Sequence, residues 1–321
     1  PRPIRGHQFM ADSVLVTGGA GYLGSILCAH LLQSGFRVTV LDNLLYGEQS
    51  LFHLCAEPRF TFVRGDVRDE QLVRRLTSEA DILIPLAAIV GAPACDRDPA
   101  LAEAVNLNAI QHLLRCRSPR QLLVFPTTNS GYGTSSGIEY CTEETPLEPI
   151  SLYGRTKVQA EAAVLQSPNT ITLRLATVFG TSPRMRLDLL VNHFVLEAVT
   201  RRVIVLFEKD FKRNFVHIRD VADCFLHCIA HGDRMAGQSY NVGLDTANLS
   251  KEELAIQIRK HVRDLTILTA ELGSDPDKRN YIVSSQRLRQ AGFEAGRSLS
   301  AGIQELIKGY QMLGRGRFMN V

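Results

Sequence analysis

The fold is decided by the segment Val14-Leu15-Val16-Thr17-Gly18-Gly19-Ala20-Gly21-Tyr22-Leu23-Gly24. Residues 14–16 form a short apolar run, which is typical of a buried parallel strand. The glycines follow at once, and residues 22–34 then have a helical period that Gly35 ends. A strand, a glycine-rich turn and a helix in this order are the context that a dinucleotide-binding fingerprint requires. An ordinary glycine-rich turn is the alternative interpretation.

The spacing of the glycines suits a dinucleotide site. Gly18 permits the tight turn, Gly21 lets the backbone approach a pyrophosphate, and Gly24 lets the helix pack closely on the sheet. The helix N-terminus offers free N–H groups and a partial positive charge to the phosphates. We therefore expect Gly18, Gly21, Tyr22 and Leu23 to contact a bound dinucleotide.

The second predicted strand, residues 37–41, ends in Asp42. A carboxylate at this place accepts hydrogen bonds from both hydroxyls of the adenosine ribose and repels a 2′-phosphate. No arginine follows directly, because the next residue is Asn43. The sequence therefore predicts NAD as the cofactor, with Asp42 and Asn43 at its ribose. A solvated aspartate at a strand end is the alternative.

Further apolar runs predict strands over residues 60–63, 81–88 and 122–125, with helical stretches between them. This alternation predicts an α/β fold with a Rossmann-like, doubly wound parallel sheet. Ligands of such sheets lie at the carboxyl ends of the strands. The residues expected there at the cofactor are Asp66, as an acceptor for the adenine amino group, with Val67, Leu86, Ala87 and Ala88.

A second motif, Tyr153-Gly-Arg-Thr-Lys157, points to chemistry. A tyrosine four residues before a lysine puts both side chains on one helical face. There the ammonium can hold the phenol partly ionised, as a tyrosine needs if it is to act as a base near neutral pH. Such a pair arises by chance in many helices, but downstream of the glycine fingerprint it predicts a redox enzyme.

Together these motifs resemble the extended short-chain dehydrogenase/reductases, which act on nucleotide-diphosphate sugars as epimerases, dehydratases and dehydrogenases. The resemblance runs roughly from Asp12 to Arg317 and includes Asp42-Asn-Leu, Gly65-Asp-Val, Leu86-Ala-Ala and Thr128 ahead of a Tyr-Gly. Segments 86–93, 127–133, 174–192 and 275–281 are similar to those of bacterial GDP-D-glycero-α-D-manno-heptose 4-dehydrogenases of capsule-sugar pathways. That likeness implies oxidation of the sugar C4 hydroxyl by bound NAD.

The resemblance implies a role for each matching residue. Tyr153 removes the proton from the sugar O4–H while hydride leaves C4 for the nicotinamide, and Lys157 lowers the pKa of the tyrosine and bonds the nicotinamide ribose. Thr128 occupies the catalytic Ser/Thr position and bonds the same sugar hydroxyl. Asn106 braces the active-site helix beside the cofactor. Residues 176–178 line the nicotinamide, through Ala176 and Val178.

Basic and amide side chains in the second half of the chain imply a place for the substrate. In the family, positions matching Asn192, Arg213 and Arg279 hold the nucleotide diphosphate. Arg184 and Arg186 flank Met185 beside a predicted helix start, and arginine forks suit diphosphate oxygens. Solvated surface arginines are the alternative for all four. His217, nearby in the sequence, is expected to be structural.

Departures from the family pattern narrow the reaction. The sugar 4,6-dehydratases have Asp-Glu directly after the catalytic threonine, where this chain has Asn129 and Ser130, which we place at the substrate. Neither residue is an effective acid or base at neutral pH. The enzymes that invert C3 or C5 use a cysteine near this place, but the nearest one here, Cys141, lies well downstream. We therefore expect redox chemistry at one carbon, without elimination.

The alternation of strands and helices becomes irregular after about residue 176. We expect residues 11–176 to form the NAD-binding domain and residues 177–321 mainly a smaller α/β substrate-binding domain, with the chain crossing between the two. Helices are expected over 187–200, 219–231 and 298–313, and strands over 203–207 and 215–218.

Composition excludes several classes of protein. The chain has 321 residues, a net charge of +3 and no basic block, so nucleic-acid and membrane-surface binding are not expected. No apolar run reaches transmembrane length, and no secretory signal pattern is present. The 7 cysteines are scattered without paired metal spacing, so we expect no metal site and buried thiols in a reducing cytoplasm. Residues 1–9 have no periodicity.

The sequence thus predicts a cytoplasmic NAD-dependent enzyme that oxidises C4 of a nucleotide-diphosphate sugar, GDP-heptose by likeness, for surface-polysaccharide biosynthesis. A 4-epimerase, which uses the same residues, is the first alternative, and a non-catalytic NAD(P)-binding regulatory protein is a remote one. The family also forms homodimers through a four-helix bundle, here expected from helices at 99–116 and 151–165.

Overall fold

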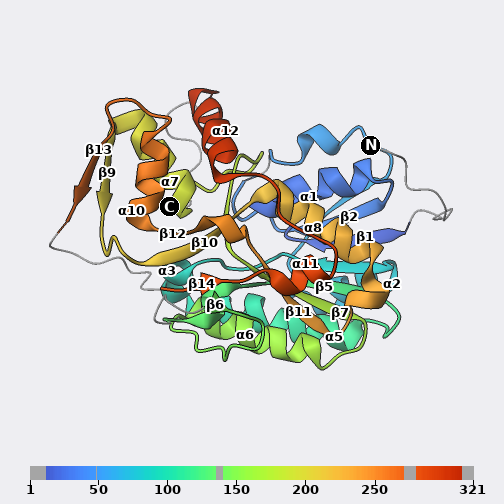
Figure 1. Cartoon of the computed structure of the whole chain (residues 1–321). Coiled ribbons are helices and arrows are strands. Elements are labelled where there is room, and N and C mark those ends of the chain that lie inside the picture. The colour runs from blue at the N-terminus through green and yellow to red at the C-terminus, as the bar shows by residue number, and fades with distance from the viewer. Residues whose placement is uncertain (1–11, 48, 135–139, 271–279, 313–321) are drawn as a thin grey trace.

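We describe residues 12–47, 49–134, 140–270 and 280–312 of the chain in a computed structural model. A seven-stranded sheet forms its centre, in the order β11-β7-β5-β4-β1-β2-β3, and all its strand pairs are parallel (Figure 1). This confirms the predicted Rossmann-like doubly wound sheet. The strands are β1 Ser13–Thr17, β2 Arg37–Asp42, β3 Phe60–Arg64, β4 Ile82–Pro85, β5 Leu122–Thr128, β7 Thr170–Leu175 and β11 Gln238–Val242.

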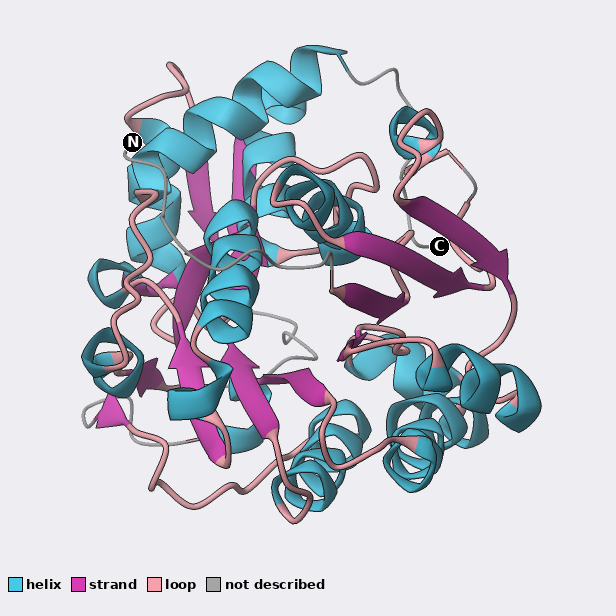
Figure 2. Cartoon of the chain, turned by 90° about the vertical axis from the view of Figure 1, so that its right-hand side faces the viewer, coloured by secondary structure: helices cyan, strands magenta, loops and turns pink. Residues whose placement is uncertain are grey.

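Helices cover both faces of the large sheet (Figures 1 and 2). Successive strand residues alternate between the two cores, as Val14 and Val16 pack in one cluster and Leu15 in the other. One face is covered by α1 Tyr22–Gln33 and α8 Ile218–Ala230, which pack on each other. The other face carries α2 Glu70–Ser78, α5 Ala109–Cys116 and α6 Leu152–Leu165.

The helix expected over residues 99–116 is interrupted. The structure has α4 Pro99–Glu103, a π-helical turn over Ala104–Asn108 and then α5. The reason lies at Asn106, whose amide accepts a hydrogen bond from Ile89 N (2.8 Å) and donates one to Ile89 O (2.9 Å). A π-turn shifts the register of the following helix, and such turns are frequent at functional sites.

The remaining elements form a smaller region of short sheets and helices. Its sheets pair β12 Asn248–Ser250 with β10 Lys212–His217 and β8 Thr177–Phe179, β13 Thr266–Thr269 with β9 Val203–Leu206, and β14 Ile282–Val283 with β6 Tyr140–Cys141. Its longer helices are α7 Leu190–Arg201, α10 Lys251–Arg259 and α12 Leu299–Met312. Beside the large sheet lie the short helices α3 Ala92–Arg97, α9 Gly232–Met235 and α11 Gln286–Gln290, and 3-10 turns occur at Phe52–Leu54, Asn129–Tyr132 and Asp245–Ala247.

The chain returns to the large sheet after its first excursion into the smaller region. Helix α8 packs on α1, and β11 then pairs with β7 in the register Gln238↔Ile171. His217 is the N-cap of α8, because its Nδ1 accepts a hydrogen bond from Arg219 N at 3.2 Å. The division into domains at residue 176 stays a prediction.

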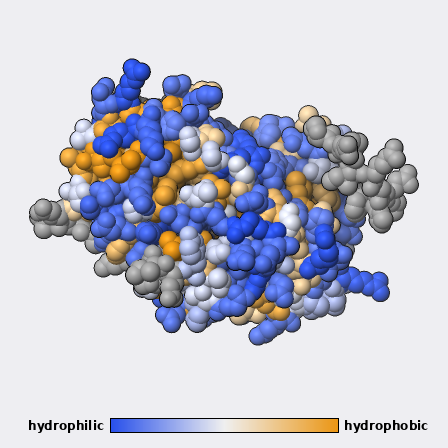
Figure 3. All heavy atoms as spheres, viewed as in Figure 1, coloured by the Kyte–Doolittle hydropathy of each residue, from blue (hydrophilic) through white to orange (hydrophobic). Residues whose placement is uncertain are grey.

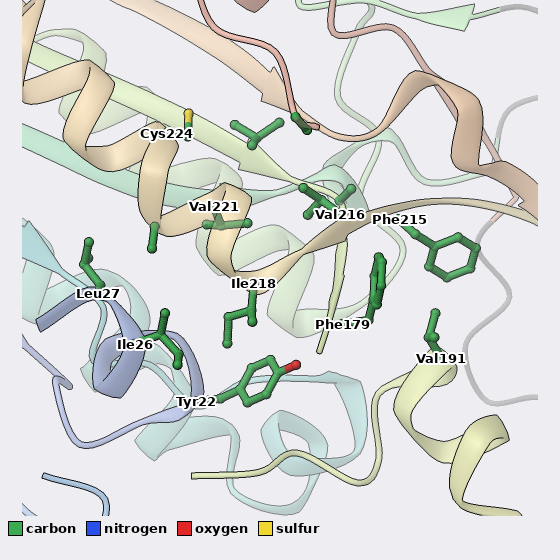
Figure 4. Packing of buried hydrophobic residues seen from close by; sticks show 14 of the residues in the cluster. Tyr22, Ile26, Leu27, Phe179, Val191, Phe215, Val216, Ile218, Val221 and Cys224 are labelled. Atoms are coloured by element: carbon green, nitrogen blue, oxygen red, sulfur yellow. The ribbon is translucent and has the colours of Figure 1, made fainter. Parts of the chain in front are cut away.

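One apolar core extends from α1 and α8 on the large sheet to β8 and α7 of the smaller region. Figure 4 shows Tyr22 and Ile26 of α1 facing Ile218 of α8, with Phe179 of β8 beside them. The Tyr22 hydroxyl donates a hydrogen bond to Gly180 O at 2.6 Å. The first turn of α1, which follows the glycine fingerprint, is thereby fixed to the segment that leads into the smaller region.

The surface carries an apolar area over the part of the smaller region that holds β9, β13 and α10 (Figure 3). Val205 and Leu268, which are register partners, are exposed there, as is Ile256. Among the described residues, no helix combines the length and apolar character that crossing a membrane requires.

Candidate active site

A cavity of about 480 Å³ lies along the carboxyl ends of the strands in the large sheet. It brings together most of the residues that the sequence placed at a cofactor. Those that line it are Gly18, Gly21, Tyr22, Leu23, Asp42, Asn43, Asp66, Val67, Leu86, Ala87, Ala88, Tyr153, Lys157, Ala176 and Val178. Four of the residues expected at the substrate also line the cavity: Thr128, Ser130, Arg184 and Arg186.

The glycine turn between β1 and α1 forms the floor of this cavity. Gly18 has φ +72°, and a Cβ atom on it would lie 2.5 Å from Ala87 N, which no side chain tolerates. The close contact explains why the strand expected over 81–88 ends at Pro85 in β4, and why residues 86–88 instead pass across the turn. Helix α1 starts without a side-chain cap, so its first turn presents backbone N–H groups to an anionic ligand.

Asp42 at the end of β2 is fixed by its backbone surroundings. Its carboxylate accepts hydrogen bonds from Ala20 N (2.9 Å) and from Leu44 N (2.8 Å). Burial raises the pKa of Asp42, while these two N–H groups act in the opposite direction. The carboxylate lines the cavity beside the glycine turn, as a ligand for ribose hydroxyls must. The floor, the helix end and this carboxylate together fit a dinucleotide.

Asp66 has a partner that the sequence analysis missed. Arg68 donates two side-chain hydrogen bonds to its carboxylate, at 2.9 and 2.8 Å, and Asn43 donates a third at 3.3 Å. The bonds from Arg68 are the largest cause that lowers the pKa of Asp66 to about 2. Arg68 itself lines the cavity. The carboxylate expected to accept from the adenine amino group is thus held by the Arg68 guanidinium. The spacing Asp66-x-Arg68 in the sequence could have predicted this pair.

Helix α6 delivers Tyr153 and Lys157 to the cavity. Ser151 caps this helix, since its hydroxyl accepts a hydrogen bond from Gly154 N at 3.1 Å. The Lys157 side chain is buried, and burial lowers its pKa to about 7, against the opposing effect of Glu161. Tyr153 interacts electrostatically with Arg186 from the other side of the cavity. Arg186, which the sequence did not place at the phenol, thus interacts with it, and Lys157 lines the same cavity.

Thr128 ends β5 and lines the cavity with Ser130. The Thr128 hydroxyl lies 2.9 Å from Ser130 Oγ and accepts a hydrogen bond from Ser130 N at 3.1 Å. Asn129 is only 1% exposed and is not among the described residues that line the cavity. Its amide oxygen and nitrogen find no hydrogen-bond partner in the described part of the chain. The structure therefore separates Asn129 from Ser130, although the sequence analysis put both at the substrate.

The arginines at 184 and 186 both line the cavity but have different partners. Arg184 Nε donates a hydrogen bond to Tyr46 O at 3.0 Å. Arg186 forms a two-pronged ion pair with Asp188, with Nε–Oδ1 and Nη2–Oδ2 distances of 2.8 and 2.6 Å. Asp188 also lines the cavity and was not predicted, although the spacing Arg-x-Asp was visible in the sequence.

Three other predicted residues lie away from the described cavity wall. Asn192 accepts from Gly180 N (3.1 Å) and donates to Tyr22 Oη (3.1 Å) and Arg186 O (2.9 Å), which occupies its amide within the protein. Arg213 is 2% exposed and stacks on the ring of Tyr281. Asn106 braces the loop at Ile89 and reaches Thr156 of α6 at 3.4 Å, so its contact with the active site is indirect. Arg279 lies outside the described residues.

Several lining residues gave no signal in the sequence. They come from segments that meet only in the folded chain: Leu45, Tyr46, Ile89, Val90, Leu101, Val105, Ser151 and Leu175. His217 is 1% exposed and hydrogen-bonds Glu305 of α12 at 3.1 Å, away from the described lining. Among the described residues, no group of three metal-ligating side chains is assembled.

Comparison with known proteins shows the family of the chain. The profile of the NAD dependent epimerase/dehydratase family matches residues 14–243. The low-salt glycan biosynthesis protein Agl12 of Haloferax volcanii is 27% identical over 312 residues, which cover 92% of this chain and 98% of that protein. The uncharacterized UDP-glucose epimerase YtcB of Bacillus subtilis is 30% identical over 258 residues, covering 75% and 78% of the two chains.

A solved structure shows the same architecture. The UDP-glucose 4-epimerase of Thermus thermophilus, determined in complex with NAD, superposes with a TM-score of 0.79 at 25% identity, covering 94% of this chain and 99% of that one. The family match includes the glycine turn, Asp42, Thr128 and the Tyr153–Lys157 pair. The chain therefore belongs to the NAD dependent epimerase/dehydratase family, and its cofactor is NAD.

Proposed function

We propose that this protein oxidises the C4 hydroxyl of a nucleotide-diphosphate sugar to a 4-keto sugar nucleotide, with a GDP-heptose as substrate. The observation that carries the proposal is the convergence of Thr128, Tyr153 and Lys157 on the cavity whose floor is the glycine turn. The GDP-heptose substrate rests on the sequence likeness of segments such as 174–192, and surface-polysaccharide biosynthesis follows from it.

The chain supplies the proton chemistry of this reaction. When bound, NAD supplies the acceptor for the hydrogen that leaves C4 with its electron pair. Tyr153 Oη takes the proton from the sugar O4–H, and the Thr128 hydroxyl bonds the same oxygen and orients it. The Thr128 hydroxyl donates to Ser130 Oγ at 2.9 Å, so it must turn from Ser130 to the sugar oxygen when the substrate binds.

Lys157 supports the tyrosine electrostatically. An ammonium beside a phenol favours the phenolate, because opposite charges stabilise the ionised form. The buried lysine has a pKa of about 7, so its charge is present below neutrality and needs a nearby anion above it. Arg186 adds a charge that persists over the whole working pH range, held in place by Asp188.

The neighbourhood of Thr128 supports oxidation without loss of water. Elimination across C5–C6 needs an acid for the leaving hydroxyl and a base for the C5 proton. The positions after Thr128 hold Asn129 and Ser130, and Asn129 is buried off the described cavity wall. A serine alone supplies neither function at neutral pH.

A 4-epimerase is the second candidate, and the names of the relatives favour it. YtcB and the Thermus thermophilus protein are both described as UDP-glucose epimerases. Epimerisation uses the same Tyr153 and Lys157, but the keto sugar turns over in the site and regains hydrogen on its other face. A purely regulatory NAD-binding protein, the third possibility, has no need of a buried lysine one turn from a cavity-lining tyrosine.

We also propose that the protein is a cytoplasmic homodimer. Within the part of the chain that the structure describes, no two cysteines form a disulfide, and thiols of this kind are typical of a reducing compartment. The dimer contact would use α4, α5 and α6, where Ala162 on α6 and Gln111 on α5 are exposed. Sedimentation over a hundredfold concentration range tests this, because a constant monomer mass would exclude the dimer.

The decisive experiment is incubation with a panel of nucleotide sugars in deuterium oxide, read by NMR and mass spectrometry. The panel contains a GDP-mannoheptose, UDP-glucose and UDP-galactose, with NAD and Tyr153→Phe protein as the inactive control. A product lighter by two hydrogens supports C4 oxidation, and an isomer of unchanged mass supports the epimerase. No product from any sugar with NAD-loaded protein would overturn the proposal.

A further inference from the structure

Arg184 connects the two sides of the NAD cavity. It belongs to the segment between β8 and α7, whereas its partner Tyr46 lies in the loop after β2. Arg184 Nε donates to Tyr46 O at 3.0 Å, and the guanidinium carbon lies 5.2 Å from the centre of the Tyr46 ring. Both residues line the cavity, so their contact, the Arg184–Tyr46 bridge, forms part of its wall.

The Tyr46 side of the bridge is the exposed end of a short loop, whose start is held by the hydrogen bonds of Leu44 N to Asp42 and of Asn43 to Asp66. Residues 43–47 follow Asp42 directly and include Leu44 in a left-handed conformation, with φ +62°. Leu45 and Tyr46 are 56% and 43% exposed, so little apolar packing fixes them. A short, exposed segment of this kind opens more readily than the helices around it.

The Arg184 side is firmly held. Arg184 is 9% exposed, and its N–H donates to Ser182 Oγ at 3.2 Å. Ser182 Oγ in turn donates to Tyr22 O at 2.7 Å, in the first turn of α1. The guanidinium thus reaches the exposed loop from a base that is fixed to the glycine fingerprint.

Arg186, two residues later, serves a different end of the cavity. Its ion pair with Asp188 and its interaction with Tyr153 place it at the reacting groups. Arg184 instead contacts the loop that follows the ribose ligand Asp42. The two arginines, which the sequence treated as one diphosphate site, thus have different hydrogen-bond partners, although both interact electrostatically with Asp188.

We infer that Arg184 is a positioning residue for the cofactor, which holds residues 43–47 against the NAD cavity and slows the exit of NAD. This goes beyond the proposed reaction and rests only on NAD as the cofactor of the family. It predicts a protein that keeps its NAD through many turnovers. A guanidinium is suited to the task, since it donates from its edge and stacks with its face at the same time.

The test measures cofactor release directly, without sugar. Protein loaded with NADH is mixed with a large excess of NAD, and the loss of bound-NADH fluorescence gives the release rate. Arg184→Ala is expected to release NADH at least tenfold faster than the wild type. Tyr46→Ala, which removes the ring from an exposed loop and leaves the fold intact, is expected to speed release by a smaller factor.

The control is Arg201→Ala, which removes an exposed arginine paired with Glu197 on α7. Its release rate should equal that of the wild type, and an equal acceleration in this control would overturn the inference. Release rates within twofold of the wild type in both Arg184→Ala and Tyr46→Ala would also overturn it. So would weakened binding of GDP and UDP to Arg184→Ala with unchanged NADH release, because Arg184 would then be a ligand of the substrate. These release measurements use no sugar, so they test the role of Arg184 even if the protein has no activity on any nucleotide sugar.

Discussion

The Lys157 ammonium lies over the ring of Phe125, with Nζ 4.0 Å from the ring centroid. Strand β5 therefore carries both the ring that receives the lysine and, at its end, Thr128. A cation over an aromatic face is favourable, but it replaces only part of the hydration that the buried ammonium loses. The pKa of Lys157 is therefore lowered to about 7, because the buried ammonium is less well stabilised than in water.

The first prediction concerns stability against pH in protein without NAD. The pKa of Lys157 falls from 10.5 to about 7 on folding, so between these values the unfolded chain binds more protons. Stability must then rise with pH across this window. Relative to Lys157→Met, the wild type should gain about 2 kcal/mol of unfolding free energy between pH 7 and pH 9, measured by urea unfolding.

Lys260→Met is the matched control, because Lys260 is exposed on the surface. The unfolding free energy of this variant, plotted against pH, should run parallel to that of the wild type. Parallel curves for Lys157→Met as well would show that the lysine keeps its ordinary pKa in the folded protein.

The second prediction is that Tyr153→Phe nearly abolishes turnover and leaves NAD affinity unchanged. The substitution removes the one oxygen that takes the substrate proton and keeps the ring. Loss of a general base costs about 10²–10⁴-fold in rate. Single-turnover absorbance at the NADH band, together with a fluorescence titration of NADH, measures both quantities. A rate near that of the wild type would reject Tyr153 as the base.

The third prediction is that Asp42→Ala narrows the preference for NAD over NADP. The carboxylate bonds ribose hydroxyls, and loss of such charge-assisted bonds costs about 1.5–3 kcal/mol in NAD affinity. Since Asp42 also accepts from Ala20 N and Leu44 N, the variant disturbs the loop for both cofactors. The ratio of the two affinities removes that common effect. Wild-type protein that binds NADP as tightly as NAD would show a misplaced carboxylate.

The fourth prediction concerns the buried ion pair behind the catalytic helix. Glu161 of α6 accepts from Arg174 Nε at 2.8 Å, and their side chains are only 2% and 7% exposed. Glu161→Gln leaves a buried guanidinium without its counter-charge, which should lower the unfolding free energy by about 3–5 kcal/mol. The exposed pair Arg201–Glu197 provides the comparison, with an expected loss of about 0–1 kcal/mol in Arg201→Ala. Equal losses at the two sites would contradict the burial argument.

The fifth prediction is that the sugar product retains all its oxygen atoms. Asn129 and Ser130 provide no acid–base pair for the removal of water. Mass spectrometry should therefore find no product that has lost a water, and NMR should find no deuterium at C5. Either signal would show that groups other than Asn129 and Ser130 act as the acid and the base of an elimination.

The elements whose cause is local could be predicted from the order of the residues. These elements are the glycine turn, the helix that follows it and the Tyr153–Lys157 pair. Each depends on the spacing of apolar residues, on the position of glycines or on the helical repeat, and all of these are properties of residues close together in the sequence. Asp42 was predictable for the same reason, because the end of a parallel strand in such a sheet always faces the ligand edge.

Which side chains are available to a ligand depends on contacts between distant parts of the folded chain. Asn192 was expected at a diphosphate, but its amide is used by Gly180, Tyr22 and Arg186. Arg184 meets Tyr46 across 138 residues of chain, and no periodicity relates positions so far apart. The hydrogen bonds of a polar side chain depend on which distant backbone groups packing brings within about 3 Å, and that is fixed by the arrangement of the elements and not by the residue types along the chain.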